Sequence, residues 1–197
     1  MRLGLSVLAL CGGGLLLAGL AAAGTIKGKL TIPHARTLAD VVVYVDKAPG
    51  TFPPPRQHPV MDQKNLAFVP HVLPVVVGTT VDFLNSDKVL HNVFTPDKCA
   101  GKFNLGTWPK GEVRSVAFDK VGCSPVLLCN VHPEMEGFVV VLQNPYFAVT
   151  DKAGLFKIPN VPEGKFTIKV WNRKPLDTTR DIAVPKDGDV VCDLALK

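Results

Sequence analysis

Proline and glycine interrupt this chain so often that long helices have little room to form. The sequence contains 17 Pro and 17 Gly among 197 residues, and they separate short segments rich in Val, Ile and Phe. After residue 23, no stretch shows a sustained apolar period of about 3.6 residues, which an amphipathic helix requires. Short β-branched and aromatic segments bounded by turn residues are typical of strands. The sequence therefore predicts an all-β fold.

One short loop carries three side chains that suit a soft metal. Cys129, His132 and Met135 follow one another at three-residue spacing, between two apolar runs. Thiolate and thioether sulfur favour Cu(I), imidazole suits both oxidation states of copper, and Met is a weak axial donor. A second imidazole is available from His91, which follows an expected strand. We therefore interpret His91, Cys129, His132 and Met135 as the ligands of one copper ion.

Three of these residues have a plainer interpretation when each is taken alone. Cys129 could be a buried structural cysteine and Met135 a core residue, and His91 could bond a carbonyl at a strand end. Zinc would accept Cys and His, but Met is a poor zinc ligand. A binuclear copper centre of the oxidase type needs two cysteines separated by three residues, whereas Cys123 and Cys129 are separated by five. The combined pattern favours mononuclear copper.

The segment from His58 to Gln143 resembles the cupredoxins, the small blue copper proteins of the plastocyanin and amicyanin type. Leu66-Ala67-Phe68-Val69-Pro70 is similar to their first core strand. His91-Asn92-Val93 resembles the pair in which the first His ligand precedes an Asn that ties the two ligand loops together. The Cys-x-x-His-x-x-Met spacing is similar to the short ligand loop of amicyanin. Leu127 departs from the pattern, because an aromatic residue is common at that position.

The resemblance implies a Greek-key β-sandwich over residues 57–144 that holds one type 1 copper per chain. Asn92 and Asn85 would support the ligands from outside, and His132 would be the port for the electron. The implied function is one-electron transfer between redox proteins, with a c-type cytochrome or a dehydrogenase as partner. Catalysis is not expected, because Met135 occupies the position that a substrate would need. Copper delivery or storage is the alternative function, and an adhesion or scaffold protein with a vestigial site is a third.

The first 23 residues have the pattern of a secretory signal peptide. Arg2 is followed by an apolar run from Leu3 to Leu20 and by the small residues Ala21-Ala22-Ala23, which predicts cleavage after Ala23. We therefore expect a periplasmic or secreted protein. The alternative is an uncleaved anchor helix, since the run is nearly long enough to span a bilayer. Contact with a membrane is expected only in that case.

Two further segments flank the copper segment. Residues 24–50 and 145–197 resemble the regulatory-like, transthyretin-like β-sandwich first described in carboxypeptidases, which begins with Gly-x-Ile-x-Gly-x-Leu or Val. We expect the two segments to form one small sandwich, with the copper segment inserted between them. The C-terminal part is short for a core of its own, which supports this interpretation. The alternative adds the N-terminal strands to the copper domain. The Pro-rich stretch 48–56 marks a boundary.

The remaining cysteines and the net charge complete the expectations. Cys99 and Cys123 have no counterpart in the simple cupredoxins, and both lie near the copper ligands in sequence, so we expect a disulfide between them in an oxidising compartment. Cys192 is expected to be a buried apolar residue. The net charge is +5, or about +4 without the leader, and no Lys/Arg run is present. This distribution argues against nucleic acid as a partner.

Overall fold

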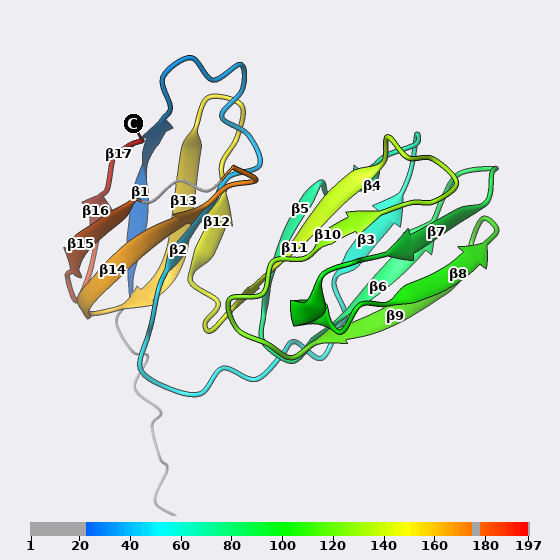
Figure 1. The fold of residues 1–197 in the computed structure, drawn as a ribbon. Coiled ribbons are helices and arrows are strands. Elements are labelled where there is room, and N and C mark those ends of the chain that lie inside the picture. The colour runs from blue at the N-terminus through cyan, green and yellow to red at the C-terminus, as the bar shows by residue number, and fades with distance from the viewer. Residues whose placement is uncertain (1–22, 175–177, 197) are drawn as a thin grey trace, which may run out of the picture.

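The computed structural model describes residues 23–174 and 178–196, whose regular structure consists of β-strands and one short 3-10 helix, η1 (Lys98–Ala100) (Figure 1). The prediction of an all-β chain is confirmed. The predicted leader lies outside the described residues, except for Ala23, the first residue of the first strand. Among the described residues, no helix has the length and apolar character needed to cross a membrane.

The middle of the chain forms a two-sheet sandwich, which we call the central sandwich. Its first sheet has the order β5 (Val72–Val76), β11 (Glu136–Leu142), β10 (Val126–Leu128), β7 (His91–Phe94) and β8 (Asn104–Trp108). Its second sheet has the order β4 (Phe68–Val69), β3 (Val60–Gln63), β6 (Thr79–Asn85) and β9 (Val113–Phe118). The strands alternate inward apolar with outward polar residues, as in β6, so that side chains such as Phe83 and Leu127 fill the space between the sheets.

The two ends of the chain form a second sandwich, the terminal sandwich. One of its sheets has the order β13 (Leu155–Pro162), β1 (Ala23–Thr31) and β16 (Asp189–Val191), with β17 (Leu194–Ala195) also paired to β1. The other has the order β12 (Phe147–Val149), β2 (Val42–Val45), β14 (Gly164–Trp171) and β15 (Thr179–Val184). The N-terminal strands β1 and β2 therefore hydrogen-bond to strands from the C-terminal segment, and the central sandwich lies between them in sequence.

The two sandwiches pack against each other through a third apolar cluster. Val42 of β2 meets Phe138, Val140 and Leu142 of β11, and Trp171 of β14 packs on the edge of this cluster. The sheets of the molecule thus form successive layers, with one core inside each sandwich and one between them (Figure 1). Burial on both faces explains why β11 reads as a continuous apolar run and does not alternate.

Side-chain amides fix the Pro-rich connector where it leaves the terminal sandwich. The Gln143 amide accepts a hydrogen bond from the Ala48 N–H and donates one to the Ala48 carbonyl, each at 3.1 Å. The buried Asn144 amide donates to the Val45 carbonyl at 2.9 Å. Because these residues immediately follow β11, the entry to and the exit from the central sandwich are joined at one point. The Pro-rich stretch therefore lies at the junction of the two sandwiches.

Candidate metal centre

Strand pairing brings the sequence-distant ligand candidates together. His91 is the first residue of β7, and Cys129 directly follows the last residue of β10. These strands are antiparallel neighbours, with Leu128 opposite Phe94. Continued past Leu128, this antiparallel register runs residues 129–131 back alongside the start of β7, and the turn after Cys129 brings His132 beside His91. His91, Cys129 and His132 form a group whose ligand atoms all lie within 4.8 Å of one another.

The distances between these three ligand atoms suit a single small metal ion. The Nδ1 atoms of His91 and His132 are 3.0 Å apart, and the Cys129 Sγ lies 3.9 Å from the first and 4.0 Å from the second. The circle through the three atoms has a radius of about 2.1 Å. Bonds of a first-row metal to imidazole nitrogen and thiolate sulfur are about 2.0 and 2.3 Å long. The donor atoms are therefore placed for one ion close to their common plane.

A carboxylate behind His91 selects the form of the ring that can bind a metal. Asp87 Oδ2 lies 2.9 Å from His91 Nε2, and His91 is fully buried. A carboxylate can only accept, so Nε2 donates the hydrogen to Asp87, and Nδ1 is the nitrogen that faces Cys129 and His132 and would bind a metal. Sequence reasoning missed Asp87. Its position four residues before a ligand His, at the end of a strand, is the signal that could have found it.

An unusual turn holds Asp87 in place. The backbone N–H groups of Asn65 and Leu66 donate to its two carboxylate oxygens at 2.8 and 3.0 Å. Both residues have positive φ, 56° and 58°, which defines a two-residue hairpin turn between β3 and β4. Desolvation pushes the pKa of Asp87 upward, but the hydrogen bonds from Leu66, His91 and Asn65 outweigh it and hold the pKa below its ordinary value.

Asn92 joins the segment that begins at His91 to the segment that follows Cys129. Its Oδ1 accepts a hydrogen bond from the Asn130 N–H at 2.6 Å, and its Nδ2 donates to Asn104 Oδ1 at 3.3 Å. Asn92 is 2% exposed, so its amide makes these bonds from within the protein. The residue after His91 is therefore bonded directly to the residue after Cys129.

Asn85 organises the loop that leads to His91. Its Nδ2 donates to the carbonyl oxygens of Val89 and Trp108, each at 2.9 Å, and its Oδ1 accepts from the Asp87 N–H at 2.9 Å. It is fully buried. One amide therefore connects both ends of the 86–90 loop to β8, whose Trp108 lies opposite His91 in the sheet.

Met135 and His132 occupy opposite environments in the same turn. Met135 is 1% exposed and belongs to the central core, and its N–H donates to the His132 carbonyl at 3.0 Å. His132 is half-buried. Exposed apolar residues occur beside it and beside His91, namely Val131 and Leu90, which are 44% and 51% exposed. The loop therefore places a thioether in the core and one imidazole in a half-buried position.

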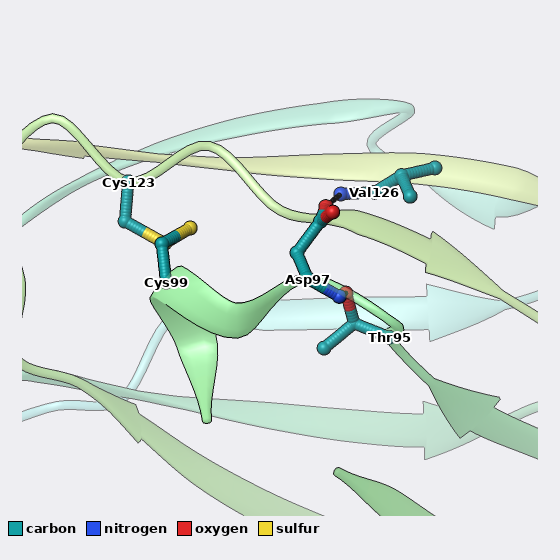
Figure 2. Close-up of a disulfide and its surroundings, with 5 residues drawn as sticks. All are labelled: Thr95, Asp97, Cys99, Cys123 and Val126. Carbon is teal, nitrogen blue, oxygen red and sulfur yellow. Dashed lines mark hydrogen bonds between the residues drawn. A yellow bond between two sulfur atoms is a disulfide. The ribbon is translucent and has the colours of Figure 1, made fainter. Parts of the chain in front are cut away.

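The structure contains a disulfide between Cys99 and Cys123, with Cα atoms 5.6 Å apart (Figure 2). It links η1, just after β7, to the segment before β10. Beside it, Asp97 accepts a hydrogen bond from the Val126 N–H at 2.8 Å, and its own N–H donates to the Thr95 hydroxyl. Strands β7 and β10 are thus also joined at the ends away from the ligand candidates.

The remaining cysteine among the residues that the structure describes lies in the terminal sandwich. Cys192 is a fully buried free thiol in the core of that sandwich. Burial raises the pKa of the Cys192 thiol, which disfavours the reactive thiolate. This environment fits the expectation of a buried apolar residue.

Comparison with solved structures returns copper proteins. The Cu(I) form of an amicyanin mutant has 29% sequence identity, covers 43% of this chain and 81% of its own chain, and gives a TM-score of 0.41. A reduced amicyanin mutant has 24% identity over 52% of this chain and 98% of its own, with a TM-score of 0.42. A copper-containing nitrite reductase from Thermus scotoductus has 26% identity over 49% of this chain and 25% of its own, with a TM-score of 0.41. No protein-family model and no curated protein matches the chain.

Proposed function

We propose that this protein is a type 1 copper protein that carries single electrons between redox partners. The observation that carries the proposal is the convergence of two imidazole Nδ1 atoms and one thiolate sulfur on a circle of about 2.1 Å radius. Met135 is the proposed fourth, axial ligand, because it is buried and its N–H is bonded to His132. When bound, copper would supply a one-electron couple between Cu(II) and Cu(I).

The protein's own contribution is a set of ligands that cannot easily rearrange. His91 and Cys129 are 0% and 2% exposed and belong to a packed β framework. The Asn92–Asn130 hydrogen bond locks the two ligand segments together, and Asp87 holds the His91 ring. Cu(II) and Cu(I) prefer different geometries, so a rigid ligand set keeps the reorganisation small when an electron arrives.

His132 is the proposed route by which the electron enters and leaves. It is the half-exposed member of the ligand group, whereas His91 and Cys129 are buried. Val131 and Leu90, which precede His132 and His91 in the sequence, are exposed apolar side chains, which favour brief contacts with another protein. We therefore propose redox proteins as partners, a c-type cytochrome or a dehydrogenase among them.

We further propose a periplasmic or secreted location. The Cys99–Cys123 disulfide supports it, because such bonds persist mainly in oxidising compartments. In this proposal residues 1–23 are the signal peptide, the central sandwich is the copper domain, and the terminal sandwich is the transthyretin-like accessory domain.

The test is to add copper to the purified protein and to record visible absorption and electron paramagnetic resonance spectra. We expect one copper per chain and intense thiolate-to-copper absorption, which Cys129→Ser abolishes and the matched Cys192→Ser leaves intact. Fast electron self-exchange supports the carrier function. Ready transfer of copper to a chelator would instead favour delivery or storage, turnover of nitrite would favour an enzyme, and failure to bind copper would refute all three.

A further inference from the structure

Strand β11 follows the ligand loop and is packed on both of its faces. Val139 and Val141 point into the central core, whereas Phe138, Val140 and Leu142 pack against the terminal sandwich. All five are at most 7% exposed. A strand buried on both faces cannot shift without disturbing two packed layers. The position of Met135, one residue before β11, therefore depends on both sandwiches.

The first residue of β11 makes a polar contact with the terminal sandwich. Arg173, which follows β14, donates from Nη2 to Glu136 Oε2 at 3.0 Å. Glu136 directly follows Met135, whose N–H is bonded to the His132 carbonyl. Two successive residues thus connect the terminal sandwich with the turn that carries His132.

The next residue fits against the opposite sheet. Gly137 lies so close to Phe68 of β4 that a Cβ added at position 137 would come within 2.8 Å of the Phe68 Cβ. Phe68 is itself 2% exposed and has no room to retreat. The backbone at the exit of the ligand loop is therefore held from the inner side as well.

Phe138 makes the main apolar contact with the terminal sandwich. Its ring centroid lies 5.3 Å from that of Trp171, the last residue of β14. On another side, the His71 ring packs edge-on at 5.7 Å, and the His71 carbonyl accepts the Phe138 N–H at 2.9 Å. His71 is in turn bonded to Asp40 of the terminal sandwich at 3.1 Å. The terminal sandwich therefore contacts Phe138 directly through Trp171 and indirectly through Asp40 and His71.

We propose that Trp171 and Arg173 are positioning residues for the ligand loop, through which the terminal sandwich sets the placement of Met135 relative to His91, Cys129 and His132. The inference rests on the proposed copper site. It assigns the terminal sandwich the role of an outer wall for the sheet that carries the ligands.

The chemistry of the axial ligand explains why such a wall would matter. A thioether on copper is a weak, long ligand, so protein packing has a large influence on its distance. Displacement of the thioether changes the relative affinity for Cu(II) and Cu(I), and hence the reduction potential. Trp171 is the last residue of β14, and Arg173 follows that strand. Among the described residues, the sheet that contains β14 has no ligand candidate.

The experiment compares residues of one strand that face opposite sides. Trp171→Ala removes the contact with Phe138, whereas Phe166→Ala removes an aromatic ring of β14 that faces the terminal core. Trp171→Phe tests rescue by a smaller ring. Arg173→Gln breaks the contact with Glu136, and Arg180→Gln is its matched control on β15. Each variant is analysed for thermal unfolding, visible and paramagnetic resonance spectra, and reduction potential.

In Trp171→Ala we expect the ratio of the Cu(II) and Cu(I) dissociation constants to change at least threefold, which is about 30 mV for a one-electron couple. Trp171→Phe restores most of the change, and Arg173→Gln shifts the ratio in the same direction by less. Phe166→Ala lowers the unfolding temperature but leaves spectrum and potential unchanged. Unchanged spectra and potential in Trp171→Ala, or an equal shift in Phe166→Ala, would overturn the inference.

Amide hydrogen exchange of the copper-free protein separates this inference from the proposed function. We expect Trp171→Ala to increase exchange at residues 130–136 at least tenfold, with no such increase in Phe166→Ala. If the unmutated protein bound no copper but Trp171→Ala still increased amide exchange at residues 130–136, the proposed function would fail and the positioning of the loop would stand. Equal exchange in both variants would overturn the positioning.

Discussion

Asp87 Oδ2 and His91 Nε2 lie 2.9 Å apart, and this one contact orients a buried imidazole toward the Cys129 sulfur. Hydrogen bonds to the outer nitrogen of a metal-binding His fix its tautomer and raise its basicity. The contact leads to the first prediction. Asp87→Asn should weaken Cu(II) binding by about 10- to 100-fold, as measured by competition with a chelator. The exposed Asp119→Asn is the control, and equal affinity in both variants would contradict the role of Asp87.

The second prediction concerns the bond between the two ligand segments. Asn92→Ala removes the acceptor of the Asn130 N–H, which should cost about 0.5–1.5 kcal/mol of unfolding free energy. We also expect broadened paramagnetic resonance lines, because the ligand loops lose their common register. Urea unfolding of the copper-free protein measures the first effect. Asn104→Ala removes the weaker 3.3 Å bond of Asn92 and should have less effect on both.

The third prediction concerns the disulfide. The paired variant Cys99→Ala with Cys123→Ala should lose about 3.5 kcal/mol of unfolding free energy, from the entropy of a loop with a sequence separation of 24 residues. The copper spectrum should remain, since the bond joins the strand ends away from the ligands. Denaturant unfolding with and without reductant measures the loss. A bleached spectrum in a folded variant would show that the disulfide also shapes the site.

The fourth prediction arises from the turn that holds Asp87. Leu66 is 45% exposed with a φ of 58°, a left-handed conformation that costs a leucine about 1–2 kcal/mol relative to glycine. Leu66→Gly should therefore raise stability by up to about 1 kcal/mol. The Leu66 N–H bond to Asp87 is a backbone bond and remains, so the copper spectrum should be unchanged. Thermal unfolding and visible absorption spectra check the two halves separately.

The fifth prediction concerns acid stability. The Ser115 hydroxyl donates to Asp82 and lowers its pKa; desolvation opposes this, and His58 adds to the lowering. The folded-state pKa is thus below the ordinary value of 3.8. The stabilisation is present above pH 3.8 and is lost as the pH falls toward the folded pKa. In Asp82→Asn, the midpoint of urea unfolding should change less steeply with pH below pH 4. An unchanged slope would contradict this assignment.

Local patterns in the sequence predicted much of this architecture. The Pro and Gly punctuation with short β-branched segments predicted an all-β chain, because turn chemistry and strand periodicity are properties of neighbouring residues. The ligand types and their order were readable because Cys129, His132 and Met135 lie on one turn. The structure then brought His91 within 3.9 Å of Cys129.

Other features depend on contacts between residues that no local pattern relates. Asp87 was missed because an exposed turn aspartate is ordinary until the β3–β4 turn and the buried His91 are placed around it. The apolar run of β11 indicated burial, but it could not show that alternate residues face two different sandwiches. Arg173 and Glu136 are 37 residues apart and look like ordinary surface charges in the sequence.

The sequence by itself thus determined the strand-forming character of the chain and the chemistry of its ligand loop, because both reside in neighbouring side chains. The tertiary structure decided which imidazole faces the thiol, which carboxylate orients it, and which sandwich braces the loop. Those outcomes depend on sheet register and layer packing. Both are set by the burial of whole strand faces, which couples residues over more than a hundred positions.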